Sequence, residues 1–253
     1  MQCARTGLRA LRGHSTWQRA SPSVWCYGLD ADALAESAQS APNVFGRHAV
    51  YVPPKALDYE LPAHNAPEVA LAGRSNVGKS TLVGALLGDP KLVRTSRKPG
   101  RTTTARLFAV AQRPEPDAAR AARRAACFLV DLPGVGFARK SKRDQDAFGE
   151  ASAAYLNERP RHILRHALVL CDARRGPCAD LLDAFDSLRV AHRVVFTKGD
   201  LASPSDLVAA LDATVERFSR KLSSLVPVVH VVSAKTGAGV DDLRAHLASI
   251  VVD

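Results

Sequence analysis

The chain has 253 residues and a formal net charge of +10, from 35 Lys and Arg against 25 Asp and Glu. It contains no run of 18 consecutive apolar residues, so we expect no membrane-spanning helix. Its five cysteines include no C-x-x-C pair and no zinc-ligand spacing, which fits a reducing compartment. The excess of positive charge favours an anionic partner.

The N-terminal 29 residues carry several arginines, serines and alanines but no acidic residue. This composition is typical of an organellar transit peptide, and we favour a mitochondrion over a plastid. The alternatives are a cytoplasmic protein and a basic RNA-binding arm. Prolines interrupt residues 30–66, which we interpret as a linker and an irregular lead-in. The sequence therefore predicts a transit peptide and linker over residues 1–45 and a single α/β domain over residues 46–253.

A glycine-rich loop follows the apolar segment at residues 68–72 and has the pattern G-x-x-x-x-G-K-[ST]. Its residues are Gly73, Arg74, Ser75, Asn76, Val77, Gly78, Lys79 and Ser80. In this pattern the backbone N–H groups cradle the α- and β-phosphates of a nucleotide, the lysine reaches the β- and γ-phosphates, and the hydroxyl group binds Mg²⁺. Residues 81–87 have helical spacing, which places the phosphates at a helix N-terminus. We therefore expect a bound nucleotide here, with Ser80 as a metal ligand.

Two more segments are expected beside the triphosphate. The first comprises Gly100, Arg101, Thr102, Thr103 and Thr104. It should supply a threonine hydroxyl group to Mg²⁺ in the triphosphate state. The second comprises Asp131, Leu132, Pro133 and Gly134, at the end of an apolar segment. Here the aspartate can hold Mg²⁺ through water, and the glycine N–H group can meet the γ-phosphate.

The identity of the base is predicted from two segments that each follow an apolar strand. The first comprises Thr197, Lys198, Gly199 and Asp200, and the second comprises Ser233, Ala234 and Lys235. The Asp200 carboxylate can accept hydrogen bonds from both the N1–H and the amino group of guanine, whereas adenine lacks this pair of donors. The Lys198 stem would lie against the base, and the second segment can offer a backbone N–H group to guanine O6. These segments favour GTP and GDP as ligands.

Apolar segments alternate with helical stretches along the domain. Strands are expected at residues 68–72, 105–112, 127–131, 167–172, 193–197 and 228–232. No helix is expected between the second and third strands, which implies an antiparallel edge pair. The Ala- and Arg-rich residues 113–126 between them are interpreted as an enlarged, mobile surface connection, with an RNA-binding tip as the alternative. The sequence thus predicts an α/β P-loop NTPase fold, a Ras-like G domain with a six-stranded, mostly parallel sheet, one antiparallel edge strand and helices on both faces.

These motifs together resemble the EngB family of GTPases, over about residues 45–253. The resemblance rests on GRSNVGKS at 73–80, KPGRT at 98–102, DLPGVGFA at 131–138, DARRGP at 172–177, TKGD at 197–200 and SAK at 233–235. It implies an enzyme that hydrolyses GTP to GDP and phosphate, acting as a switch in assembly of the large ribosomal subunit. It also implies that Thr102 binds Mg²⁺ beside Ser80. Val135 departs from the family pattern, which usually has an aromatic residue there, and Thr103-Thr104 stand where a glutamine is usual.

We expect slow, Mg²⁺-dependent hydrolysis, because apolar Val135 stands where signalling G proteins place a water-orienting glutamine. The catalytic groups are predicted to be Lys79, Thr102 and Gly134. Asn76 is a candidate to hold K⁺ near the phosphates, or alternatively it only turns the loop. A scaffold that binds RNA and uses GTP as a structural ligand, with negligible hydrolysis, is the alternative function.

Two basic clusters flank the predicted switch segments. They comprise Arg94, Arg97, Lys98 and Arg101 in the first, and Arg139, Lys140, Lys142 and Arg143 in the second. Because both switches converge on the γ-phosphate, the clusters should form one basic face that contacts RNA of the large ribosomal subunit. A solvated charged surface is the alternative. We expect no integral membrane association, since the chain has neither an 18-residue apolar run nor a lipidation motif. We also expect a monomer.

Overall fold

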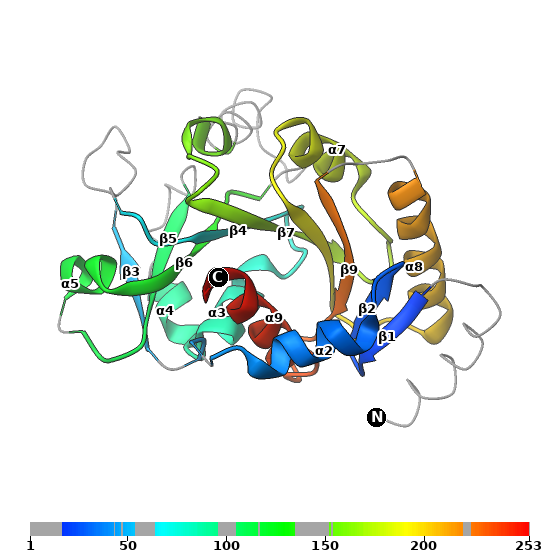
Figure 1. Ribbon diagram of the computed structural model, residues 1–253, viewed down its shortest axis with the longest axis horizontal. Helices are drawn as coiled ribbons and strands as arrows, with labels where there is room; N and C mark the ends of the chain where they lie inside the picture. The colour runs from blue at the N-terminus through cyan, green and yellow to red at the C-terminus, as the bar shows by residue number, and fades with distance from the viewer. Residues whose placement is uncertain are drawn as a thin grey trace.

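The computed structural model describes residues 17–42, 44–46, 48–53, 64–95, 105–115, 117–134, 152, 154–219 and 224–252. Within these residues, nine strands form one sheet in the order β1-β2-β9-β8-β7-β4-β6-β5-β3 (Figure 1). The strands are β1 Trp17–Ser21, β2 Val24–Tyr27, β3 His48–Val52, β4 Glu68–Gly73, β5 Arg106–Ala111, β6 Ala125–Asp131, β7 Leu164–Asp172, β8 His192–Thr197 and β9 Leu225–Val231. The helices are α2 Ala31–Ser40, α3 Lys79–Leu87, α4 Pro90–Thr95, α5 Ala118–Arg123, α7 Ala179–Ser187, α8 Pro204–Ser219 and α9 Val240–Val252.

The centre of the sheet is parallel, from β6 through β4, β7 and β8 to β9. These strands are apolar on both faces because helices cover both sides. Val69 and Leu71 of β4 pack in the cluster formed with α3 and α9, while Ala70 and Ala72 pack in the cluster formed with α7 and α8. The predicted α/β fold, with helices on both faces of a mostly parallel sheet, is confirmed.

The sheet is larger than the six strands that the sequence predicts, and its antiparallel part extends beyond a single edge strand. The predicted antiparallel pairing of β5 with β6 is present. Beyond β5, strand β3 adds a further antiparallel edge. At the opposite end, the β1–β2 hairpin pairs antiparallel with β9. Strands of four and five residues leave too short an apolar pattern to stand out within a proline- and arginine-rich segment.

The interpretation of residues 30–66 as an irregular linker is wrong for α2 and β3. Helix α2 begins after Asp30, whose carboxylate accepts hydrogen bonds from the backbone N–H groups of Asp32 and Ala33 at 2.9 and 3.1 Å. The helix lies along α9 (Figure 1). β1, β2 and α2 therefore belong to the folded domain, although they fall within the span that composition assigns to a transit peptide and linker.

Removing residues 1–29 is expected to destabilise the domain. Val24, Trp25 and Cys26 of β2 are 0, 5 and 0% exposed, and burial of each large apolar side chain contributes roughly 1.5–3 kcal/mol. Chains that start at residue 30 and at residue 17 would be compared by urea unfolding, since the longer chain keeps both strands of the hairpin. We expect the shorter chain to be less stable by at least about 3 kcal/mol. Equal stability would show that the hairpin contributes nothing to the domain.

The connection between β5 and β6 contains a short helix rather than the mobile loop that the sequence suggests. α5 begins after Asp117, whose side chain accepts a hydrogen bond from the N–H group of Arg120 at 2.8 Å. Ala121 is fully buried and packs in the same core cluster as α7 and α8. None of the helices in the described part of the chain has the length and apolar character needed to cross a bilayer.

Candidate nucleotide-binding site

The predicted motifs meet at the carboxyl end of the parallel strands. The glycine-rich loop follows β4, the Asp131 segment ends β6, the Thr197 segment ends β8, and the Ser233 segment follows β9. In open α/β sheets this edge is where ligands bind. The first switch segment, residues 100–104, lies outside the described residues, and so does Val135.

The backbone of the glycine-rich loop leaves the first turn of α3 open to an anion. A Cβ atom on Gly73 would lie 2.8 Å from Val77 Cγ1 and 3.0 Å from the Leu170 carbonyl oxygen, so only glycine fits. Gly78, with a φ of 99°, is the N-cap of α3, and no side chain among the described residues caps the helix. The free N–H groups and the helix dipole therefore favour a phosphate at this end.

Two side chains of the loop meet Asp131 from β6. Lys79 Nζ donates to Asp131 Oδ1 at 2.7 Å, and Ser80 Oγ lies 3.4 Å from Oδ2 of the same carboxylate, which is fully buried. Ser80 and Asp131 thus offer hard oxygen atoms at about the spacing, roughly 3 Å, of neighbouring ligands around Mg²⁺. This donor set fits Mg²⁺. Thr102, the other predicted ligand, lies outside the described residues.

Gly134 lies against the glycine-rich loop. A Cβ atom on Gly134 would be 3.4 Å from Ser75 Oγ and 3.6 Å from its backbone nitrogen. Leu132 is held in the core, 1% exposed, and its N–H group donates to the Leu71 carbonyl oxygen at 3.1 Å. Pro133 between them is also buried. The segment therefore turns across the loop, where its backbone N–H groups can meet a terminal phosphate.

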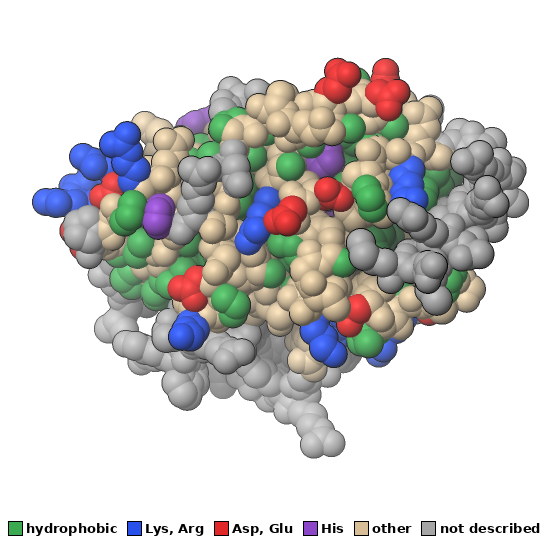
Figure 2. Space-filling model, turned by 90° about the horizontal axis from the view of Figure 1, so that it is seen from below, with side chains coloured by type: hydrophobic (Ala, Val, Ile, Leu, Met, Phe, Trp, Pro, Cys, Tyr) green, Lys and Arg blue, Asp and Glu red, His purple; other side chains and the backbone are tan. Residues whose placement is uncertain are grey.

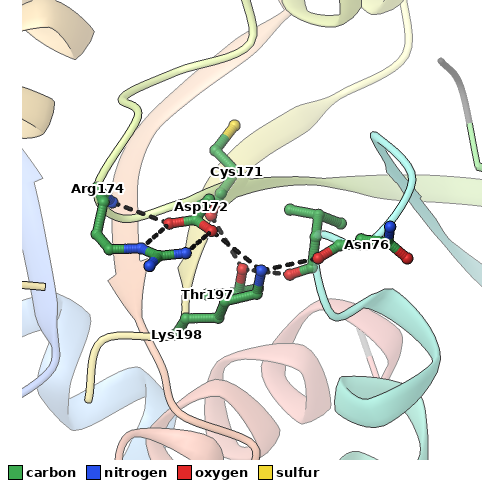
Figure 3. Close-up of polar contacts among 7 residues, drawn as sticks. Asn76, Cys171, Asp172, Arg174, Thr197 and Lys198 are labelled. Carbon is green, nitrogen blue, oxygen red and sulfur yellow. Dashed lines mark hydrogen bonds and ion pairs between the residues drawn. The ribbon is translucent and has the colours of Figure 1, made fainter. Parts of the chain in front are cut away.

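The guanine segment is tied directly to the glycine-rich loop. Lys198, with a φ of 58°, donates from Nζ to the Asn76 carbonyl oxygen at 2.8 Å (Figure 3). Thr197 Oγ1 donates to the Val77 carbonyl oxygen at 2.6 Å. Asn76 itself has a φ of 63°, a conformation that asparagine tolerates, which supports the simpler alternative that it turns the loop. The structure thus joins the two segments that are predicted to hold the phosphates and the base.

The Ser233 segment, which follows β9, lies beside the guanine segment. The Gly199 N–H group donates to the Val232 carbonyl oxygen at 3.0 Å, just before Ser233. Ser233 is 2% exposed, and its side chain accepts a hydrogen bond from the Thr236 N–H group at 3.2 Å. Asp200 and Lys235 are exposed, and Ala234 is partly buried between these loops. Asp200 is therefore accessible to a base at this edge.

Asp172 of the DARRGP segment holds Lys198 of the guanine segment, a role that the motif alone did not reveal. Its carboxylate accepts hydrogen bonds from Arg174 at 2.9 and 2.7 Å and from Lys198 Nζ at 3.0 Å (Figure 3). These contacts, those from Arg174 above all, hold the pKa of Asp172 well below its usual range. A cavity of about 430 Å³ lies beside this network, between the glycine-rich loop and the start of α7.

Arg106 is a further site residue that the sequence did not suggest. It is the first residue of the apolar strand β5, where an arginine is ordinarily exposed, yet it is 8% exposed and contacts Asp131. The only available signal is cross-strand register: Arg106 faces Asp131 in the β5–β6 ladder. That register depends on the length of the connection and is not visible in the local pattern.

This fold and these four converging loops define a P-loop GTPase with a G domain. The family model described as 50S ribosome-binding GTPase matches residues 68–198. The chain is 34% identical over 226 residues to "Probable GTP-binding protein EngB" of Caulobacter vibrioides, covering 88% of this chain and 92% of that protein. It is 37% identical over 196 residues to the protein of the same name from Gluconobacter oxydans, covering 76 and 79%. The chain belongs to the EngB family of GTPases.

A solved structure agrees with this fold. The crystal structure of a probable GTP-binding protein EngB superposes with a TM-score of 0.56 at 19% identity, covering 73% of this chain and 98% of that chain. GTP binding and GTP hydrolysis follow from the family, as the resemblance implied.

Proposed function

We propose that this GTPase is a nucleotide-controlled switch in assembly of the large ribosomal subunit, in a mitochondrion. The observation that carries the proposal is the match of residues 68–198 to a family described as 50S ribosome-binding GTPases, because those residues contain the glycine-rich loop and both predicted switch segments. GTP would order the segments around Thr102 and Gly134, and hydrolysis would release them.

The site geometry supports a different binding role for each of the four loops. The open first turn of α3 and the Lys79 ammonium group bind the phosphates, and Asp200 reads the guanine edge. Ser80 and Thr102 would hold Mg²⁺, with Asp131 acting through water, and the ion would neutralise charge on the phosphates. K⁺ near Asn76 remains a prediction.

The partner is proposed from charge. The basic clusters that flank the two switches, in residues 94–101 and 139–143, would meet rRNA through its phosphates. A second group of exposed arginines, Arg113, Arg120, Arg123 and Arg124, lies on and beside α5. Lys and Arg side chains gather at that end of the molecule (Figure 2). α5 contacts β3 and β5 at one end of the sheet (Figure 1), so a nucleotide-dependent contact is better served by the switch clusters.

Reversing charge at Lys140 and Lys142 to glutamate is expected to weaken binding to large-subunit particles, by at least about tenfold at low salt, because phosphate contacts are lost. Affinity for GTP should stay unchanged. The measurement is co-sedimentation of the chain, loaded with a non-hydrolysable GTP analogue, with purified particles. The matched control reverses Arg120 and Arg123 on α5. If the control loses binding and the switch variant keeps it, the proposed face is wrong.

A further inference from the structure

The predicted metal site contains a cation from the chain itself. The Arg106 guanidinium group contacts Asp131 Oδ2 and lies 3.3 Å from Ser80 Oγ, so one Nη2 atom reaches both oxygen donors of the site. Its other terminal nitrogen donates to the Val93 carbonyl oxygen at 3.4 Å. Arg106 is therefore held against this oxygen pair from two sides.

The three charged groups at this point do not cancel. Asp131 contributes one negative charge, while Lys79 and Arg106 each contribute one positive charge, and all three side chains are at most 10% exposed. The resulting charge of about +1 sits at the N-terminus of α3, where the helix dipole adds positive potential. The chain thus presents a cationic surface to a diphosphate before any metal ion enters.

We propose that Arg106 shares the Asp131 carboxylate with Mg²⁺ and makes GDP binding by this chain largely independent of Mg²⁺. The inference rests on the nucleotide site proposed above. Arg106 is a positioning residue, because it contacts the groups that hold the metal ion. Two physical effects act in the same direction. The guanidinium group competes with Mg²⁺ for Asp131, and in the absence of Mg²⁺ it supplies part of the positive charge that the phosphates require.

A purely structural role would not explain these contacts. Pairing with Asp131, which faces Arg106 across β5 and β6, would by itself give the guanidinium group a carboxylate partner. The additional approach to Ser80 places the same nitrogen on the second oxygen of the predicted metal pair. By thermodynamic linkage, the factor by which Mg²⁺ tightens GDP binding equals the factor by which GDP tightens Mg²⁺ binding, so one ratio measures the coupling.

The test is the dissociation constant of GDP for the full chain with Mg²⁺ and with EDTA, measured by a fluorescent GDP analogue. We define the Mg²⁺ ratio as the dissociation constant in EDTA divided by that in Mg²⁺. For the natural chain we expect this ratio to be below about tenfold. Arg106→Gln should raise it at least about tenfold further, whereas Arg106→Lys, which keeps the charge, should leave it near the natural value. Arg123→Gln on exposed α5 is the matched control and should change nothing.

Several outcomes would overturn the inference. A ratio above about a hundredfold in the natural chain would do so without any variant, even if Arg106→Gln failed to fold in a thermal melt. The inference would also be wrong if folded Arg106→Gln had the same ratio as the natural chain. It would equally be wrong if Arg106→Lys had a ratio as high as that of Arg106→Gln. If the natural chain does not bind GDP even with Mg²⁺, the nucleotide site itself is wrong, which is a separate result.

Discussion

Replacing Asp200 with asparagine is expected to lower the affinity for GDP by about 10²–10⁴-fold. Each of the two hydrogen bonds from guanine to the carboxylate contributes roughly 1.5–3 kcal/mol, and the amide cannot accept both. The asparagine amide can instead donate to the oxygen that xanthine carries in place of the guanine amino group. Xanthosine diphosphate should therefore bind the variant better than GDP does. Because Asp200 is exposed, the substitution should leave the fold intact.

Calorimetric titration with GDP, xanthosine diphosphate and ADP measures this change. The matched control is Asp212→Asn on the exposed face of α8, which should bind all three nucleotides as the natural chain does. Thermal melts of both variants should superimpose on that of the natural chain. If Asp200→Asn binds GDP as tightly as the natural chain, Asp200 does not read the base.

The second large effect is loss of stability in mild acid. A buried polar cluster spans β7, β8, β9 and α9. Arg193 Nε donates to His166 Nε2 at 2.9 Å, and His230 Nε2 lies 3.3 Å from His246 Nδ1. Burial, followed by the nearby Arg193 charge, holds the pKa of His166 and of His230 well below the usual histidine value of 6.5. Burial also lowers the pKa of His246 and of the neighbouring His192.

The lowered pKa values of these histidines make the folded chain less stable in acid. Below about pH 6.5 the unfolded chain takes up protons at these histidines, while the folded chain keeps them neutral, so acid favours unfolding. Each fully buried histidine then lowers the unfolding free energy by about 1.4 kcal/mol per pH unit. His166 and His230 together lower it by about 3 kcal/mol per pH unit. Protonation of His166 would also break its hydrogen bond with Arg193.

Glu68 acts in a different pH window. Burial works to raise its pKa, but hydrogen bonds from His64 and Arg159 outweigh burial and leave the pKa below its usual value of 4.5. The carboxylate of this group therefore stabilises the fold above about pH 4.5, and that contribution is lost only as the pH falls further. Acid sensitivity between pH 5 and 6.5 can thus be assigned to the histidines.

Urea unfolding of the natural chain and of His230→Gln, at several pH values between 5 and 7.5, measures the effect. The natural chain should lose stability steeply below about pH 6.5, and the variant less steeply by about 1.4 kcal/mol per pH unit. His162→Gln at an exposed position should keep the natural slope. If the stability of the natural chain does not change between pH 5 and 7.5, the buried histidines do not stay neutral in the folded chain as expected.

The sequence predicts most of the nucleotide site because its motifs are local. The spacing of Gly73, Gly78 and Lys79 determines the loop geometry, and the strands that lead into the phosphate and guanine segments, β4 and β8, are fully buried. Helix α9 carries Asp241 and Asp242 in its first turn, a local pattern that favours a helix N-terminus.

The features that the sequence missed depend on contacts between distant segments. Residues 24–26 of β2 pair with residues 228–230 of β9, across about two hundred residues of chain, so no local pattern shows that β2 is a strand. The same holds for the pairing of Arg106 with Asp131, and for the histidines of three strands and one helix that meet around Arg193. Composition pointed to a leader in residues 1–29, yet Ser21 and Ser23 hydrogen-bond with Asp242 of α9.

Under the proposed function, the bound nucleotide controls association of this GTPase with the large ribosomal subunit. The most direct measurement is co-sedimentation of the natural chain with purified large-subunit particles, in parallel with a non-hydrolysable GTP analogue, with GDP and without nucleotide. Binding at least about tenfold tighter with the analogue than with GDP is the expected result. Equal binding in all three conditions, or none in any of them, would contradict the claim.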